Sequence, residues 1–265
     1  MNITEHAGEP QPFPQFPKVR PPLPQAYLSL YESEYLENRA SGSLANKTAR
    51  MLESWMHAKV RQTAAKLSEE ILEIGAGTLN HIPWERGNLR YDIVEPFRKL
   101  FENSANLKLV RHVYSDIKEI PKERRYDRIL SVAVLEHMVD LPSVVALSGL
   151  HLHQHGVFCA GIPSEGAWLW EMAWRYGTGT SFRRRTGLDY AMMMHHEHLN
   201  TAAEIETCIR YFFHDVSIKR FPLRLLPLSL YTFLHAIKVH KQRCTRFIEL
   251  REHTATAKAN SITNF

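Results

Sequence analysis

The chain has 265 residues and 44% hydrophobic content, so it can bury one sizeable α/β core with a helical appendage. Its formal net charge of +5 with neutral histidines permits an anionic substrate or a membrane surface but requires neither. We expect most of this charge to form a solvated basic surface.

The composition also bears on the cellular compartment. The three cysteines stand far apart, and an odd number does not suit a complete disulfide framework. The N-terminus lacks the basic start and apolar core of a secretory signal. The longest apolar stretch, residues 225–239, is interrupted by Pro227 and His235 and is shorter than the ~18 residues of a membrane span. These features predict a cytoplasmic protein without a transmembrane segment.

The N-terminal part of the chain divides into an arm and a helical cap. Residues 1–25 are rich in proline, which favours an extended arm that wraps the domain or a partner. Apolar residues at three- and four-residue steps predict one helix over 26–40 and another over 44–67. Together they form an N-terminal helical cap, residues 26–68, which could either cover a ligand cleft or pack on the sheet.

The segment ILEIGAGTLNH, residues 71–81, is the centre of the sequence. Its apolar run predicts a buried strand, and Gly75 and Gly77 allow a turn whose backbone passes close to a ligand. A dinucleotide fingerprint would place a third glycine at position 80, where this chain has Asn80, and no P-loop Gly-Lys-Ser or Gly-Lys-Thr follows. The pattern therefore indicates a nucleotide-cofactor loop other than these two.

The rest of the chain alternates strands with helices, which predicts a doubly wound, mostly parallel sheet. We expect further strands at 91–94, 107–113, 126–132 and 156–163, helices at 97–103, 141–153, 168–176 and 201–213, an irregular segment at 177–200, and strands at 214–222 and 231–240. Ligands of such sheets bind at the carboxyl ends of the strands. That rule puts one set of residues on a single rim: Glu73, Gly75, Glu95, Asp116 and Ser131.

Several segments carry a family resemblance. An acid followed by Gly-x-Gly is joined, in order, by YDIVEP (91–96), YSDI (114–117) and YDRILSVAVLEHMVD (126–140). From about residue 70 to 163, and more loosely to 240, the chain resembles the class I S-adenosylmethionine-dependent methyltransferases. The resemblance implies a Rossmann-like seven-stranded sheet with an antiparallel edge pair, a methyltransferase domain at 69–244, and S-adenosyl-L-methionine as cofactor. A polar tail is expected at 245–265.

The resemblance also implies which residues bind the cofactor: Glu73, Gly75, Ala76, Gly77, Glu95, Asp116, Ile117 and Ser131. Glu95 would accept both ribose hydroxyls, Asp116 the adenine amine, and Glu73 the ammonium group. Glu95 could instead be an acid at a helix start, and Asp116 a turn residue. Leu79 stands where the family often has glycine, which is expected to alter contacts near the methionine end.

Candidate residues for the methyl acceptor are histidines and arginines. A hydroxyl acceptor gains from a base, and the candidates are His196 first and His137 second. His195 and His198, with Arg183 and Arg184, are expected to contact the substrate, and the paired donors of the arginines suit an anionic one. No metal site is predicted, because HHEH lacks a helical His-x-x-x-His pair.

The function predicted from the sequence is that of an S-adenosylmethionine-dependent methyltransferase. Its acceptor is expected to be a small molecule, methylated on oxygen, such as a sugar, a sugar nucleotide or a related metabolite. One alternative is an RNA or protein methyltransferase, although no aromatic-basic RNA motif accompanies the arginines. The alternative from another class is a catalytically inactive cofactor-binding interaction protein that uses the proline-rich arm as its contact.

Overall fold

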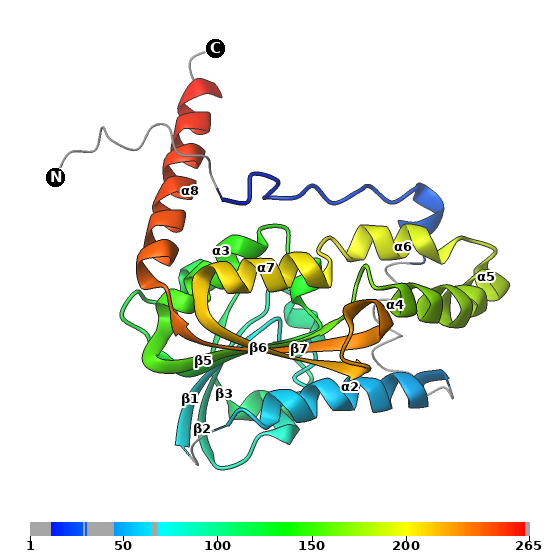
Figure 1. The fold of residues 1–265 in the computed structure, drawn as a ribbon, viewed down its shortest axis with the longest axis horizontal. Coiled ribbons are helices and arrows are strands. Elements are labelled where there is room, and N and C mark those ends of the chain that lie inside the picture. The colour runs from blue at the N-terminus through cyan, green and yellow to red at the C-terminus, as the bar shows by residue number, and fades with distance from the viewer. Residues whose placement is uncertain (1–11, 29, 31–44, 65–67, 263–265) are drawn as a thin grey trace.

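A seven-stranded sheet lies at the centre of the computed structural model, which describes residues 12–28, 30, 45–64 and 68–262 (Figure 1). The strands are β1 (Ser68–Ile74), β2 (Asn88–Val94), β3 (Val110–Tyr114), β4 (Tyr126–Val132), β5 (Leu152–Pro163), β6 (Phe213–Pro222) and β7 (Ser229–Val239). Their order is β3-β2-β1-β4-β5-β7-β6. β1 to β5 are parallel, and β7 runs antiparallel to β5 and β6. The predicted fold class, including the antiparallel edge pair, is confirmed.

Helices cover both faces of the sheet. The α-helices are α2 (Ala45–Arg61), α3 (Leu141–His151), α4 (Trp168–Ala173), α5 (Thr180–Thr186), α6 (Tyr190–Glu197), α7 (Ala202–Phe212) and α8 (Lys241–Ile262). Shorter turns are η2 (Ile82–Trp84), η3 (Arg98–Leu100), η4 (Ala105–Leu109), η5 (Ile117–Glu119), η6 (Leu135–His137), the π-helical η7 (Trp174–Gly179) and η8 (Leu226–Leu228). α2 lies on one face, and α3, α7 and α8 lie on the other (Figure 1).

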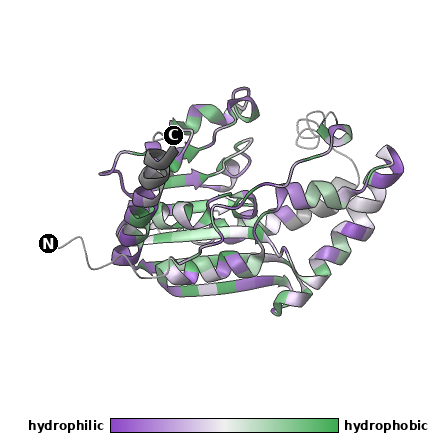
Figure 2. Cartoon of the chain, turned by 90° about the horizontal axis from the view of Figure 1, so that it is seen from above, coloured by the Kyte–Doolittle hydropathy of each residue, from purple (hydrophilic) through white to green (hydrophobic). Residues whose placement is uncertain are grey.

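Two apolar cores result from the two-residue period of the strands. On β1, Leu72 packs toward the core that contains Phe212 of α7, whereas Ile71 packs toward the core that contains Val60 of α2. The central strands are accordingly coloured as largely apolar in Figure 2. Both faces of the sheet are therefore covered, as parallel strands require.

The helix predicted over 44–67 is α2, and it packs on the sheet. Met56 and Val60 are buried, and a Cβ atom at Gly161 of β5 would lie 2.8 Å from Met56 Cβ. Glycine at this position therefore admits the helix. Most of the helix predicted over 26–40 lies outside the described residues. The described residues in this range, 26–28 and 30, are helical.

The prediction of an irregular segment at 177–200 is wrong, because most of it is helical. α5 ends at Gly187, whose φ of +75° suits a C-terminal cap, and Asp189 caps α6 by accepting a hydrogen bond from the Ala191 amide. Phe182 and Met194 anchor the two helices through their buried side chains. The helix predicted at 97–103 is reduced to the single turn η3.

Within the polar tail expected at 245–265, the chain is helical as far as Ile262, where α8 ends. Phe247 is buried against α7, and Arg251 donates to the Phe16 carbonyl at 2.7 Å and to Asp140 Oδ1 at 3.1 Å. These contacts hold a helix that is polar by composition. None of the described helices is long and apolar enough to cross a membrane.

The described part of the arm, residues 12–24, has no regular secondary structure and packs on the domain itself. Phe16 is buried in the core, and the Lys18 amide donates to the Val139 carbonyl at 2.9 Å. In Figure 1 the arm runs from the α8 side of the molecule toward α6. The arm is therefore in a position to contact residues at the carboxyl ends of the strands.

Candidate functional site

The glycine loop after β1 has the backbone that its sequence predicted. Gly75 and Gly77 have φ angles of +70° and +50°, and a Cβ atom at Gly75 would lie 2.3 Å from Val134 Cγ1. Leu79 also has a left-handed φ of +63° while its side chain is buried. This conformation costs a non-glycine residue about 1–3 kcal/mol, which agrees with the glycine often found here in the family that the sequence resembles.

Glu95 joins the glycine loop to the end of β2. Its carboxylate accepts hydrogen bonds from the Gly77 amide at 2.8 Å and from the Phe97 amide at 3.0 Å. Each carboxylate oxygen has a second lone pair. The side chain is 6% exposed, so these bonds fix it at the rim of the sheet. The arrangement can bind two adjacent hydroxyl groups.

The other cofactor candidates on the rim have different surroundings. Asp116 is exposed, and one of its oxygens accepts from the Lys118 amide at 2.9 Å, which caps η5. Ile117 and Ala76 are buried apolar residues. Ser131 is fully buried, and its hydroxyl donates to the Ile74 carbonyl at 3.2 Å between β4 and β1. The structure therefore leaves Asp116 accessible and uses the Ser131 hydroxyl inside the sheet.

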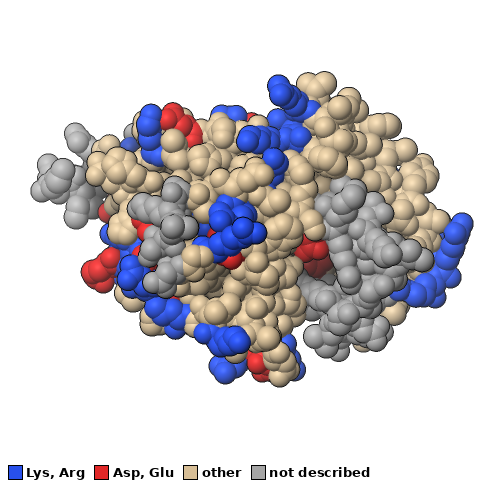
Figure 3. Space-filling model, turned by 90° about the horizontal axis from the view of Figure 1, so that it is seen from below, with Lys and Arg blue, Asp and Glu red and all other residues tan. Residues whose placement is uncertain are grey.

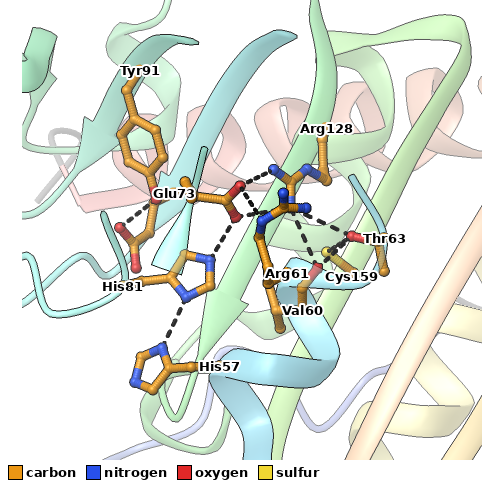
Figure 4. A network of polar contacts seen from close by, with 10 residues as sticks. His57, Val60, Arg61, Thr63, Glu73, His81, Tyr91, Arg128 and Cys159 are labelled. Carbon is orange, nitrogen blue, oxygen red and sulfur yellow. Dashed lines mark hydrogen bonds and ion pairs between the residues drawn. The ribbon is translucent and has the colours of Figure 1, made fainter. Parts of the chain in front are cut away.

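Glu73 is a residue of β1, and its side chain lies beside a buried polar network (Figure 4). Its carboxylate accepts a hydrogen bond from the Tyr91 hydroxyl at 2.8 Å. Burial is the main cause that raises the Glu73 pKa to about 8, and repulsion by Glu85 and Glu95 adds to this effect, while the Tyr91 hydrogen bond opposes it. A tyrosine of β2 is thus one hydrogen-bond partner of this buried acid.

The network next to Glu73 fixes the connection between β1 and β2. His57 of α2 lies 2.8 Å from His81, measured between their Nδ1 atoms, and His81 Nε2 lies 2.9 Å from Glu85 Oε1. Arg128 of β4 donates to both oxygens of Glu85, at 2.9 and 2.6 Å. Burial raises the Glu85 pKa, but the hydrogen bonds from His81 and Arg128 outweigh it, and the net shift is downward. No sequence pattern indicated this network.

A second group of polar residues follows β4 and β5. We call it the histidine-carboxylate cluster and define it as Glu136, His137, Glu165, Glu197 and His198. His137 Nδ1 lies 2.8 Å from the Glu197 carbonyl oxygen, and His198 Nδ1 lies 2.6 Å from Glu165 Oε2. One potential ligand atom from each of Glu136, His137 and His198 lies within 4.8 Å of the others.

The cluster contains strongly perturbed acids. Burial raises the pKa of Glu136, which is 1% exposed. Burial also opposes ionisation of His137, but the hydrogen bond that His137 donates to Glu197 and the charges of Glu136 and Glu197 reverse this effect and raise the His137 pKa. For Glu165 burial acts to raise the pKa, but the hydrogen bonds from His198 and Trp170 and the charge of His198 together outweigh burial, and the net shift of the pKa is downward. Clusters of this kind are typical of functional sites.

Backbone contacts hold the two halves of the cluster together. The amides of Leu199 and Asn200 donate to the Glu136 carbonyl at 2.7 and 2.9 Å. Arg20 of the arm donates from Nη2 to the His137 carbonyl at 2.9 Å and from Nη1 to the His196 carbonyl at 2.6 Å. The arm therefore ties η6 to the end of α6.

Among the remaining acceptor candidates, His196 borders the cluster, since its Nε2 lies 3.8 Å from Glu197 Oε1. His196 faces the arm, where its Nδ1 lies 2.6 Å from the Pro21 carbonyl oxygen. His195 lines a hollow beside the arm, which His198 also borders. Arg183 and Arg184 are exposed on α5, at the outer end of the helical extension in Figure 1. The structure thus brings together His137 and His198, and not His196 or the arginines.

Sequence reasoning overlooked three residues of this region. Glu165 follows the end of β5, and its Oε2 also accepts from Trp170 Nε1 at 2.6 Å. Glu136 precedes a histidine that was singled out, and Arg20 belongs to the proline-rich arm. An acid directly after a strand end was a usable signal for Glu165, whereas the role of Arg20 depends on contacts more than 100 residues away.

No protein-family model and no curated protein sequence matches the chain. Among solved structures, it resembles an S-adenosylmethionine-dependent methyltransferase from Thermotoga maritima, described as a possible histamine N-methyltransferase, with a TM-score of 0.54 and 13% identity over 79% of this chain and 99% of the other. It also resembles the N-methyltransferase NodS from Bradyrhizobium japonicum, in complex with S-adenosyl-L-homocysteine, with a TM-score of 0.52 and 13% identity over 80% of this chain and 98% of the other. A third similar structure is that of a possible exported protein from Bordetella parapertussis, with a TM-score of 0.54 and 11% identity over 72% of this chain and 68% of the other. The resemblance predicted from the sequence is therefore confirmed at the level of the fold.

Proposed function

We propose that the protein is an S-adenosylmethionine-dependent methyltransferase that acts on a small molecule, with oxygen of a sugar, sugar nucleotide or related metabolite as the methylated atom. The observation that carries this proposal is the rim itself. The glycine loop, held by Glu95, contacts Val134, and the histidine-carboxylate cluster begins two residues after Val134. This adjacency of the glycine loop and the polar cluster supports a cofactor site beside an acceptor site.

On the cofactor side, the ribose and the adenine of S-adenosylmethionine each find a suitable group. The free lone pairs of Glu95 can accept both ribose hydroxyls, and the exposed oxygen of Asp116 can accept the adenine amine. The glycine loop lets backbone amides approach the ligand. The S-adenosylhomocysteine complex of NodS supports this choice of cofactor.

On the acceptor side, methyl transfer needs alignment and, for a hydroxyl, loss of a proton. The cofactor supplies the leaving group, so alignment can contribute about 7–11 kcal/mol in favourable cases. We assign activation of the acceptor to His137 and His198 in place of His196, because only these two belong to the cluster next to the loop.

The alternatives have less support. On the face seen in Figure 3, lysine and arginine side chains lie in several separate places, which suits a solvated surface better than an RNA-binding path. The proline-rich arm, the proposed contact of an inactive interaction protein, packs over its described part on this chain's own domain. We therefore place the enzyme first.

Calorimetric titration tests the cofactor, and turnover tests the enzyme. We expect S-adenosylmethionine and S-adenosylhomocysteine to bind and NAD not to bind. Methyl-labelled cofactor, incubated with panels of sugars, sugar nucleotides and amines, identifies the acceptor class. Binding of NAD without binding of either sulfur compound would contradict the proposal.

A further inference from the structure

We propose that Glu136, His137 and His198 form a binding site for a divalent transition-metal cation of the Zn²⁺ class. The site itself rests on geometry and charge. Its role, which is to hold the acceptor oxygen for methyl transfer, rests on the proposed function.

The three side chains converge closely enough to share one ion. One donor atom of each lies within 4.8 Å of the others, and His137 Nε2 lies 3.7 Å from Glu136 Oε1. Ligands of one zinc ion stand at about 2.0–2.2 Å from the metal, and so about 3–4 Å from one another. Side-chain rotations that move the ligand atoms by about 1 Å would bring all three atoms into this range.

Both imidazoles are held as metal-ligating histidines usually are. His137 Nδ1 faces the Glu197 carbonyl, and His198 Nδ1 faces Glu165 Oε2. Since both partners only accept, each Nδ1 carries the proton and each Nε2 is left as a donor atom for a metal. Trp170 fixes Glu165 in turn through its own hydrogen bond to Oε2.

Glu136 supplies an independent observation. It is 1% exposed, and its Oε2 atom has no hydrogen-bond partner among the residues that the structure describes. A buried carboxylate oxygen without a partner is costly, because its hydration is lost and nothing replaces it. A cation between Glu136 and the two histidines would take the place of the lost hydration.

The charge of the surroundings matches a divalent ion. Three carboxylates, those of Glu136, Glu165 and Glu197, stand against one guanidinium, that of Arg20, which lies 3.7 Å from Glu197. Lys18 pairs with its own acid, Glu204. With all three acids ionised and the histidines neutral, the cluster together with Arg20 carries a net charge of about −2, which one divalent cation offsets.

Three protein ligands leave an open coordination position, as in catalytic zinc sites. An acceptor hydroxyl bound there loses its proton to water more readily, because the metal lowers its pKa. The resulting alkoxide oxygen forms a bond to the methyl carbon. The carbon–sulfur bond breaks with both electrons going to sulfur, which yields S-adenosylhomocysteine.

Metal titration of the full-length protein, freed of metal by a chelator, tests the site. Zn²⁺ affinity is measured by competition with a chelating indicator, and Co²⁺ by its visible absorption. We expect one site that is lost, by 100-fold or more in affinity, in Glu136→Gln and His198→Ala. Glu165→Gln, which removes only the charge behind His198, should cost about 10–100-fold.

His196→Ala is the matched control, since it removes a histidine two residues from His198 that faces the arm instead. It should retain the site, and circular dichroism confirms that each variant folds. Equal affinity in wild type, Glu136→Gln and His198→Ala would overturn the metal site. S-adenosylmethionine binding, measured without metal, is a separate readout. If the cofactor binds and the metal does not, the metal site is refuted and the proposed function stands. If the metal binds and the cofactor does not, the metal site stands, and the proposed function falls together with the role of the metal in it.

Discussion

Replacement of Glu73 by glutamine should remove a pH-dependent destabilisation of the fold. The Glu73 pKa rises from its ordinary value of 4.5 to about 8 in the folded protein. Below pH 4.5 the acid is protonated in both the folded and unfolded states. Between pH 4.5 and 8 the folded state holds a proton that the unfolded state has released, so the free energy of unfolding falls as pH rises. At about 1.4 kcal/mol per pH unit, the loss reaches ~5 kcal/mol at pH 8.

Glutamine resembles the protonated acid and can still accept from the Tyr91 hydroxyl, so Glu73→Gln should lack this slope. Urea unfolding of both proteins at several pH values from 5 to 8.5 measures it. The difference in unfolding free energy should be small near pH 5 and grow to several kcal/mol in favour of the variant at pH 8. A constant difference across this range would show that Glu73 titrates normally and would refute the argument.

Further predictions concern the rim and its support. Glu95→Ala should weaken S-adenosylmethionine binding by about 1.5–3 kcal/mol, the range for hydrogen bonds to a charged group, and an unchanged dissociation constant in a folded variant would remove Glu95 from the ribose. Gly75→Ala should destabilise the protein by about 2–4 kcal/mol through its positive φ and its clash with Val134, and Val134→Ala in the same chain should recover part of this loss in thermal unfolding. Arg128→Met should lower the free energy of unfolding by about 3–5 kcal/mol, because it leaves Glu85 charged and buried. The double variant Arg128→Met with Glu85→Gln should lose less stability in the same urea assay. Equal losses in the two variants would contradict this interpretation.

The acceptor region shows how local patterns can mislead. The HHEH run drew attention to His196 because three histidines and an acid stand together in the sequence. At the end of α6 these side chains point in different directions: His196, on the helix, meets the arm at Pro21, while His198, the residue after the helix, turns toward Glu165. Sequence proximity on a helix does not place side chains on one face, since consecutive residues are about 100° apart.

The sequence by itself determined the features that depend on local period and turn chemistry. The alternation of apolar strands and helices is typical of a doubly wound sheet, and Gly75 with Gly77 indicated a ligand-binding turn. The helix predicted at 201–213 is α7, which begins with a capping box formed by Thr201 and Glu204. Each of these follows from interactions within a few residues.

Only the tertiary structure decided what is built from distant segments. Glu136 and His137 meet His198 from about 60 residues away, and the Arg20 side chain binds backbone carbonyls 117 and 176 residues further along the chain. α8 is polar in composition and becomes part of the core because Cys244 and Phe247 are buried there, with the Phe247 ring against Phe212 of α7. Such contacts depend on which faces the folded sheet brings together, and no local pattern records that choice.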